Sequence, residues 1–315
     1  MFNAIKRICL LLIFLCVVNI ICYSQELCIP FHLSANSSII LEGYEMRGKP
    51  LNLYYDSGTT VSTLNKNTAL ELGFSYSGDT SSIESLGERH IPLYFFTNHY
   101  IDPYFYLFPC AIAEEILYDM VEEDVDGIVG HTPFLEKYLL EIDFENNQLC
   151  FRDTMPLFYT TNSQVKAAVL VRPDYGTEKK YSNYYSKDFF SIRGSYTIAD
   201  SIIYTTFVLD TGCHSYSFAN MFEESLFEKA IEYKKEKSAM YGDSYPTSRL
   251  TIPELGVDSL FTNMRVKKTF DKKAIHKQYF GNKSVGGYLG IDFFLQYKKI
   301  LFDWKNKIAY FYKES

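Results

Sequence analysis

The 315-residue chain lacks the features on which several classes of protein depend. Acidic residues outnumber basic ones, 38 to 31, and the formal net charge of -7 leaves no basic excess for a nucleic-acid backbone. The seven cysteines and six histidines are scattered, without the close spacing of a metal-ligand set. No Gly-rich phosphate-binding motif is present. We therefore expect no nucleic-acid partner, no metal and no cofactor.

Long apolar runs are also missing, apart from one at the N-terminus. There, Lys6 and Arg7 precede an apolar run that ends near Cys22. The run has about 15 residues, short of the roughly 20 that span a bilayer, and a basic start before such a run is typical of a secretory signal peptide. We expect residues 1–24 to be removed by cleavage after Ser24, leaving an exported (periplasmic or secreted) protein without stable membrane insertion. The alternative is a retained anchor.

Cysteine is sparse in the chain that would remain. It would keep Cys28, Cys110, Cys150 and Cys213. An even number in an oxidising compartment permits disulfides, and four cysteines allow three pairings, among which the sequence does not choose.

Aromatic residues, in contrast, are abundant at 17% of the chain, with 27 Tyr and 25 Phe. Aromatic and β-branched residues favour pleated, half-buried surfaces. Short apolar segments such as 104–112 and 261–266 alternate with turn signals in both halves of the chain. These patterns predict a mainly β fold.

A pattern repeated about 155 residues apart divides the chain into two copies. Each copy has an apolar run ending in Asp-Ser/Thr-Gly, then an apolar-apolar-Gly motif, then an Asp-x-x-Asn segment before a final strand. These landmarks begin at Asp56, Ile128 and Asp143 in the first copy and at Asp210, Tyr288 and Asp303 in the second. Two unrelated turns would not share this order of landmarks. We expect lobes at 25–165 and 190–315, joined by a polar linker at 166–189.

The landmarks resemble those of pepsin-like aspartic peptidases. Segment 288–306 resembles the C-terminal signature of that family, segment 126–130 resembles the signature of its first lobe, and the two Asp-Ser/Thr-Gly motifs resemble its catalytic loops. The compact lobes are closer in size to the retroviral relatives. The resemblance implies an acid-protease fold, with two homologous β-barrel-like lobes around a central cleft, that hydrolyses protein or peptide substrates. A chain carrying both lobes needs no second copy, so we expect a monomer.

The resemblance implies that Asp56 and Asp210 are the catalytic pair. Two carboxylates about 3 Å apart cannot both ionise cheaply, so they share one proton and can activate a bound water. The residues that would support the catalytic loops are Ser57, Gly58, Thr59, Thr211, Gly212 and Cys213. In this family the Ser57 and Thr211 positions brace the two loops through their hydroxyl groups.

Cys213 departs from the family pattern, which usually has Ser, Thr or Ala after the second Gly. A thiol is a weak hydrogen-bond donor. We therefore expect Asp210 to lack a bond that favours its ionised form, to carry the shared proton, and to give a pH optimum less acid than that of pepsin. The alternative is that Cys213 is buried or disulfide-bonded, with no electrostatic effect.

The predicted flap is a second departure. The first-lobe hairpin is expected to turn at residues 86–89, around Gly87, without the Tyr that pepsins carry there. Tyr241 beside Gly242 is an alternative lid in the second lobe, and both turns could equally be plain surface turns. These departures leave open a second function, a peptide-binding protein that kept the fold and lost catalysis. The intact Asp and Gly residues favour the peptidase.

Overall fold

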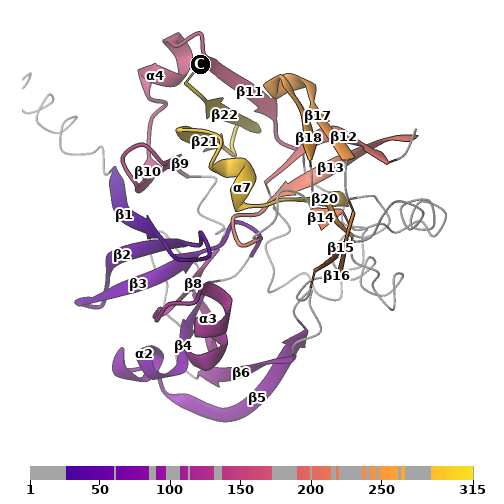
Figure 1. Ribbon diagram of the computed structural model, residues 1–315. Coiled ribbons are helices and arrows are strands. Elements are labelled where there is room, and N and C mark those ends of the chain that lie inside the picture. The colour runs from indigo at the N-terminus through magenta and orange to yellow at the C-terminus, as the bar shows by residue number, and fades with distance from the viewer. Residues whose placement is uncertain are drawn as a thin grey trace, which may run out of the picture.

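The computed structural model in Figure 1 describes most of the chain after the N-terminal segment. The described residues are 26–59, 62–84, 90–96, 107–112, 114–130, 137–171, 190–198, 201–213, 218–219, 236–238, 242–245, 248–261, 264–266 and 285–314. The predicted signal peptide (1–24), residues 172–189 of the predicted linker, Gly87 and Tyr241 lie outside them. No helix among the described residues is long and apolar enough to cross a membrane.

Strands dominate the first half of the chain. They are β1 (Leu27–Leu33), β2 (Ile39–Met46), β3 (Lys49–Tyr55), β4 (Ser62–Asn65), β5 (Tyr76–Glu84), β6 (His90–Phe96), β7 (Leu107–Ile112), β8 (Gly127–Val129), β9 (Leu139–Asp143) and β10 (Gln148–Arg152). The helices are α2 (Lys66–Glu71), α3 (Glu114–Val121) and α4 (Leu157–Thr161).

The second half has the same character. Its strands are β11 (Val165–Val169), β12 (Ser191–Ile198), β13 (Ser201–Leu209), β14 (Phe218–Ala219), β15 (Glu236–Ser238), β16 (Gly242–Tyr245), β17 (Ser248–Ile252), β18 (Val257–Phe261), β19 (Met264–Val266), β20 (Val285–Leu289), β21 (Lys299–Asp303) and β22 (Ile308–Tyr312). Its helices are the 3-10 helix η3 (Pro253–Leu255) and α7 (Ile291–Phe294). The predicted mainly β fold is confirmed, although the described strands form mixed sheets and no closed barrel.

The repeat seen in the sequence is also a repeat in topology. In the first half, β3 pairs in parallel with β8, which pairs antiparallel with β4. In the second half, β13 pairs in parallel with β20, which pairs antiparallel with β14. Each Asp-Ser/Thr-Gly loop therefore leaves a strand that lies beside the apolar-apolar-Gly segment of its own half.

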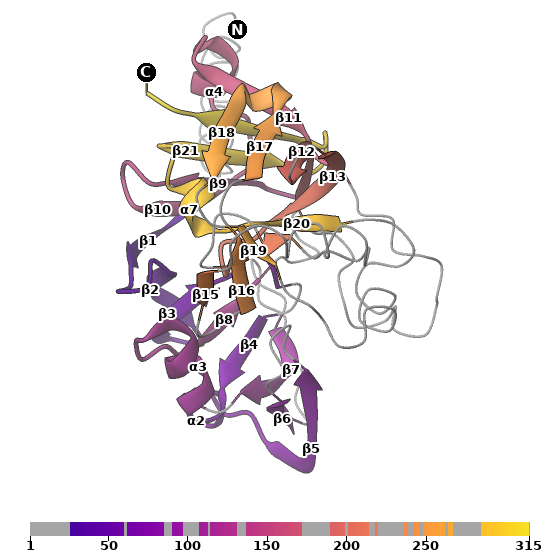
Figure 2. The ribbon, with the colours of Figure 1, turned by 45° about the vertical axis from the view of Figure 1, so that its right-hand side comes forward.

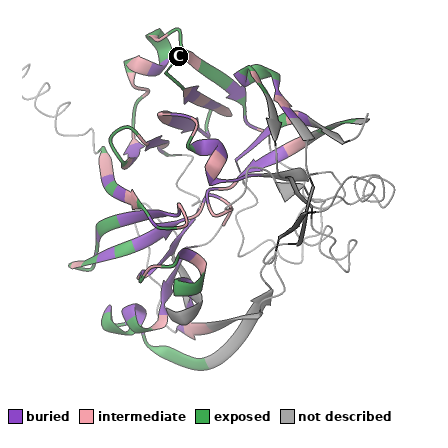
Figure 3. Ribbon diagram, viewed as in Figure 1, coloured by how far each residue is buried: buried purple, intermediate pink, exposed green. Residues whose placement is uncertain are grey.

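One sheet joins the two halves. The strand order β11-β22-β21-β9-β10-β1, one end of a 13-stranded sheet, places β21 of the second half directly against β9 of the first. Figures 1 and 2 both show strands β11, β22 and β21, with α4 beside them, at the opposite end of the molecule from β5 and β6 of the same sheet. The first residues of the predicted linker form β11, which pairs with β22. Many of the buried residues in Figure 3 belong to a large apolar core that includes side chains of both halves, and a second, smaller cluster lies in the first half.

The Asp-x-x-Asn segments fold into the same turn in both halves. Asp143 accepts hydrogen bonds from the backbone N–H (3.0 Å) and side-chain amide (2.8 Å) of Asn146. Asp303 accepts the same pair from Asn306, at 2.9 and 2.7 Å. This agreement between side-chain contacts supports a duplicated structural unit.

A disulfide ties the N-terminal strand to the joint sheet. Cys28 of β1 and Cys150 of β10 stand directly opposite each other in the strand register and are bonded. The sequence left three pairings open, and this bond is one that the strand register selects. Closing a loop of more than 100 residues stabilises the folded state by about 5 kcal/mol in the chain-entropy account.

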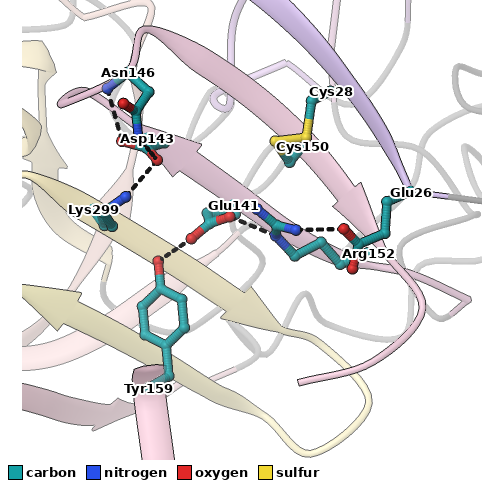
Figure 4. Close-up of a disulfide and its surroundings, with 9 residues drawn as sticks. All are labelled: Glu26, Cys28, Glu141, Asp143, Asn146, Cys150, Arg152, Tyr159 and Lys299. Carbon is teal, nitrogen blue, oxygen red and sulfur yellow. Dashed lines mark hydrogen bonds and ion pairs between the residues drawn. A yellow bond between two sulfur atoms is a disulfide. The ribbon is translucent and has the colours of Figure 1, made fainter. Parts of the chain in front are cut away.

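Charged side chains next to the disulfide link the strands further (Figure 4). Arg152 lies between Glu26, at 2.7 Å, and the buried Glu141, at 2.5 Å. The hydroxyl of Tyr159 from α4 donates to the other oxygen of Glu141, at 2.6 Å. The buried carboxylate thus has partners for both oxygens, as a charge removed from water requires.

An ion pair crosses the seam between the halves. Lys299 of β21 stands opposite Asp143 of β9, and its Nζ lies 2.6 Å from Asp143 Oδ2. Burial acts to raise the pKa of Asp143, but hydrogen bonds from Lys299 and Asn146 outweigh it and lower this pKa below its ordinary value.

We expect Asp143→Asn to destabilise the protein by about 2 kcal/mol near neutral pH, because Lys299 would lose its buried partner. A carboxyl with a lowered pKa stabilises the folded state above its unfolded pKa of about 3.9, and this contribution is lost as pH falls through the lower folded value. Denaturant unfolding of both proteins over a pH series should show the difference shrinking in acid. Asp303→Asn is the control for the repeated turn, and an equal, pH-independent loss in both variants would contradict the prediction.

Candidate active site

Both Asp-Ser/Thr-Gly loops are held by the strand that lies beside them. The backbone N–H of Asp56 donates to the carbonyl of Val129 at 2.9 Å, where β8 ends. The N–H of Asp210 donates to the carbonyl of Leu289 at 3.0 Å, where β20 ends. The apolar-apolar-Gly segments therefore fix the position of both aspartates through the backbone.

The brace expected between Ser57 and Thr211 is present. The N–H of Ser57 donates to Thr211 Oγ1 at 2.9 Å, and the N–H of Thr211 donates to Ser57 Oγ at 2.8 Å. The Ser57 hydroxyl donates to the carbonyl of Leu209, at 2.8 Å, and the Thr211 hydroxyl donates to that of Tyr55, at 3.3 Å. Both side chains are fully buried. This reciprocal set of bonds locks the two loops in one arrangement.

The structure brings the two predicted catalytic aspartates together. The two carboxyl groups lie next to each other, and a hydrogen bond with Asp56 is among the causes that raise the pKa of Asp210. A Cβ on Gly58 would overlap the carboxyl group of Asp210, and a Cβ on Gly212 would overlap that of Asp56. Each glycine is therefore required by the carboxyl of the opposite loop.

Backbone donors orient the same two carboxyl groups. The N–H of Gly58 donates to Asp56 Oδ1 at 2.7 Å, and the N–H of Gly212 donates to Asp210 Oδ1 at 2.9 Å. Asp56, Asp210 and both glycines are partly exposed, so the pair is accessible to solvent. A water molecule can therefore approach two oriented carboxyl groups.

The pKa of Asp210 is raised well above its ordinary value. Burial is the largest cause, followed by the charge of Asp56 and the hydrogen bond between the two side chains. The backbone N–H groups of Gly212 and Cys213 act in the opposite direction and do not outweigh these effects. A raised pKa favours Asp210 as the holder of the shared proton, but its causes are burial and Asp56, so the expected effect of the Cys213 thiol stays a prediction.

Two tyrosines before Asp56 are also part of its surroundings. Tyr54 and Tyr55 are almost completely buried, and burial raises the pKa of both phenols. Tyr54 also interacts electrostatically with Asp56, Asp210 and Cys213. Sequence reasoning treated these residues only as an apolar run. The two consecutive side chains enter different apolar clusters on the two faces of β3, so they fix the strand that leads to Asp56.

Two further residues missed in the sequence support the first loop. Ser62 Oγ accepts the N–H of Gly130, at 3.1 Å, and holds the segment that follows β8. Asp126, just before β8, accepts the N–H of Asn52 at 2.9 Å and the hydroxyl of Thr68 at 2.6 Å. The Asp126 signal was present in the sequence as the first residue of the Asp-Gly-Ile-Val-Gly motif, but its partners are distant along the chain.

Cys213 is a half-buried thiol, so the disulfide alternative does not apply to it. Its carbonyl accepts the N–H of Ile291 at 2.8 Å, which anchors the end of the second loop to α7. Thr59 takes the equivalent position in the first loop, where its methyl and carbonyl lie against Gly130.

Replacing Cys213 by Thr should shift the pH–rate profile to lower pH by about one unit. A hydroxyl is a better donor than a thiol, and a hydrogen bond to a carboxylate is worth about 1.5–3 kcal/mol, which favours ionised Asp210. The limb that reports loss of the shared proton should move most. The measurement is kcat/KM across the acid range, with Cys213→Ser as a second hydroxyl variant. If the pH–rate profiles of both variants coincide with that of the wild type, Cys213 does not influence the proton shared by Asp56 and Asp210.

Of the predicted flap residues, Gly242 begins β16, whereas Gly87 and Tyr241 lie outside the described residues. Glu84 of β5 pairs with His90 of β6, on either side of segment 85–89 in the sequence. Ser238 pairs with Gly242 across β15 and β16, which encloses Tyr241. The substrate-binding roles of Gly87, Tyr241 and Gly242 stay predictions. Within the described part of the chain, no group of His, Cys, Asp and Glu is arranged to hold a metal ion.

Comparison with known proteins gives a likeness in structure but not in sequence. No protein-family model and no curated protein sequence matches the chain. A crystal structure of the aspartic proteinase from Irpex lacteus is 12% identical, covers 92% of this chain and 98% of its own, and has a TM-score of 0.48. Basic 7S globulin from soybean is 10% identical, covers 93% and 96%, and has a TM-score of 0.50. At these identities the likeness concerns fold alone. The chain has an aspartic-protease-like fold, which fits both a peptidase and a protein with this fold but no catalysis.

Proposed function

We propose that the protein is an aspartic endopeptidase that hydrolyses peptide bonds with a water activated between Asp56 and Asp210. The observation that carries the proposal is the reciprocal contact at the centre of the molecule. Gly58 lies against the Asp210 carboxyl, Gly212 lies against the Asp56 carboxyl, and the neighbouring Asp56 helps to raise the pKa of Asp210. A proton-sharing pair open to solvent is the chemical requirement of this reaction.

The two acids would act in different roles. Asp56, as the ionised member, accepts a proton from the bound water, while protonated Asp210 donates its proton to the oxygen of the substrate carbonyl. The water oxygen bonds to the carbonyl carbon and gives a neutral tetrahedral diol. On collapse, Asp56 returns its proton to the leaving amine and Asp210 regains one from the diol hydroxyl. The carbon–nitrogen bond then breaks and the pair returns to its starting state.

Preorganisation of the loops supports this proposal. The four hydrogen bonds of the Ser57–Thr211 brace are buried and join the halves of the chain on either side of the pair. Carboxyl groups fixed before substrate binds need little reorganisation as charge develops in the transition state.

We further propose that the protein acts after export, as a monomer, on protein or peptide substrates. The Cys28–Cys150 bond supports an oxidising compartment, because structural disulfides persist there and are rare in the cytosol. Each half supplies one acid, so one chain provides a complete pair.

A peptide-binding protein without catalysis is the second candidate function. The observation that favours it is Cys213, where the resembling family usually has Ser, Thr or Ala. Such a protein would bind peptides in acid without cleaving them, whereas the peptidase would release fragments.

A digest of casein and a mixed-peptide library at acid pH tests the proposal, with and without pepstatin and with Asp56→Asn in parallel. The peptidase should cleave, and the variant should not. Cleavage that survives in Asp56→Asn would overturn the mechanism. Binding without cleavage by the wild-type chain would favour the second candidate, and resistance to pepstatin alone would not, because an altered flap can cause it.

A further inference from the structure

A histidine on the surface of the first half bridges two acidic side chains from different elements. His32 Nδ1 lies 2.9 Å from an oxygen of Glu42, and Nε2 lies 2.7 Å from an oxygen of Glu123. His32 belongs to β1 and Glu42 to β2, whereas Glu123 follows α3 in the connection to β8 and is 91 residues away along the chain. One imidazole ring therefore ties the β1–β2 pair to this connection.

The bridge is complete only when the imidazole is protonated. Carboxylates accept hydrogen bonds and donate none, so each ring nitrogen must carry a hydrogen, and only the imidazolium carries two. Burial acts to lower the pKa of His32, but the hydrogen bonds and charges of Glu123 and Glu42 outweigh it and raise this pKa.

Other groups near this end of β1 do not oppose the bridge. Glu122 and Asp124 flank Glu123 in the connection and add charge of the same sign. The turn before β10, whose Asn147 carbonyl accepts the N–H of Phe31, contains one more acid, Glu145, while its Asn146 and Asn147 do not titrate. The charged surroundings of His32 are thus acidic on every side that these elements present.

The connection held by His32 needs such an anchor. Glu122, the residue after α3, has a φ of 58°, a left-handed conformation that favours glycine. Two residues after Glu123 the side chain of Val125 enters the core, and Asp126 bonds the N–H of Asn52 and the hydroxyl of Thr68. The His32 bridge fixes the part of the connection between the strained helix end and these contacts.

The same connection leads directly to the first catalytic loop. β8 begins at Gly127, packs tightly against Thr63 and Leu64, and ends at Val129, whose carbonyl accepts the N–H of Asp56. About six residues along the chain thus separate Glu123 from the carbonyl that holds Asp56.

We propose that His32 is a pH-dependent positioning residue, whose imidazolium clasps Glu42 and Glu123 in acid, steadies β8 beneath Asp56, and releases the connection as pH rises. The link to Asp56 rests on the proposed peptidase function, whereas the clasp itself does not. A histidine whose folded pKa is raised contributes stability that is complete below the unfolded pKa of about 6.5 and is lost as pH rises through the folded value. The clasp is thus closed in the acid range where a proton-sharing carboxyl pair works.

Two substitutions at residue 32 distinguish the effect of a positive charge from the effect of its loss as pH rises. His32→Gln removes the imidazolium at every pH, and His32→Arg supplies a cation that stays charged and can reach two carboxylates. Thermal unfolding at about pH 5 should show His32→Gln melting roughly 2–4 °C below wild type and His32→Arg close to it. At about pH 8 the wild-type chain should fall to the level of His32→Gln, while His32→Arg should melt above both.

The pH dependence of kcat tests the positioning role, because a residue that only stabilises the fold would leave it unchanged. Between about pH 6 and pH 8, kcat should decline less steeply in His32→Arg than in wild type, with KM little changed. Lys49→Gln is the matched control, because it breaks the exposed Lys49–Glu71 ion pair of the same half with a cation that does not titrate in this range. Its effect on melting should be equal at both pH values.

The outcomes for the clasp and for the peptidase are distinguishable. Equal melting of wild type and His32→Gln at about pH 5, or a difference that persists unchanged at about pH 8, would overturn the clasp whether or not the protein cleaves peptides. If the wild-type chain cleaves nothing, unfolding still decides the clasp. If it cleaves and melting shifts as expected while the kcat profiles coincide, His32 stabilises the fold without positioning Asp56, and the inference fails.

Discussion

Replacing Asp56 or Asp210 by Asn is expected to lower kcat by about 10⁴-fold with little change in stability. An amide cannot accept the proton of the bound water in place of Asp56, nor hold and deliver the shared proton in place of Asp210. Asn has nearly the same shape as Asp, and the Gly58 and Gly212 N–H groups can still donate to its side-chain oxygen. Removing the repulsion between two acids also offsets part of the lost hydrogen bonding.

The measurement is single-turnover and steady-state cleavage of one identified peptide by both single variants and the double variant. Because the pair acts as a unit, the double variant should be scarcely slower than either single one. Asp153→Asn, at an exposed carboxyl, is the matched control and should retain wild-type kcat. Losses that multiplied in the double variant would indicate independent roles and would contradict a shared proton.

Adding a single methyl group at Gly58 or Gly212 should lower kcat by about 10²–10³-fold while leaving both acids in place. The Cβ of Gly58→Ala would overlap the carboxyl of Asp210, and that of Gly212→Ala would overlap the carboxyl of Asp56. The nearest atoms belong to short side chains in braced loops, so the acids must move apart to make room. A displacement of about 1 Å in a catalytic group can cost 10²-fold in rate.

A comparison with Gly43→Ala separates this effect from backbone strain. Gly43 has open space around it but a φ of 65°, so alanine there should cost about 1 kcal/mol of stability and leave kcat unchanged. The alkaline limb of the pH–rate profile should also move down in Gly58→Ala and Gly212→Ala, because separated carboxyls hold the shared proton less firmly. Wild-type rates in both alanine variants would mean that the carboxyls do not meet in solution as they do in the structure.

The parts of the site that depend on sequence motifs could be predicted. Asp56, Asp210 and their glycines belong to short repeated segments, and the chemistry of a carboxyl pair demands close backbone approach. The brace between Ser57 and Thr211 followed from the family resemblance. The repeated Asp-x-x-Asn segments also led to the same turn in both halves, since their hydrogen bonds are local.

Contacts between distant segments were not predictable in the same way. The Cys28–Cys150 bond depends on the register of β1 against β10, and composition leaves that register undetermined. The His32–Glu123 contact joins residues 91 positions apart through the end of a helix, with no motif to signal it. The predicted linker began at residue 166, yet residues 166–169 belong to strand β11 because they pair with β22. In each case the contact depends on pairing between distant segments, which local sequence preferences do not determine.

The joint sheet has a consequence for any attempt to produce one half of the protein alone. β9 is hydrogen-bonded to β21 along four register pairs, and both strands carry side chains of the shared core. A fragment ending after α4 would expose the bare backbone edge of β9 together with an apolar surface, and such an edge is a template for another strand. The fragment should self-associate through that edge, so that two copies rebuild a continuous sheet and bring two Asp56 side chains face to face.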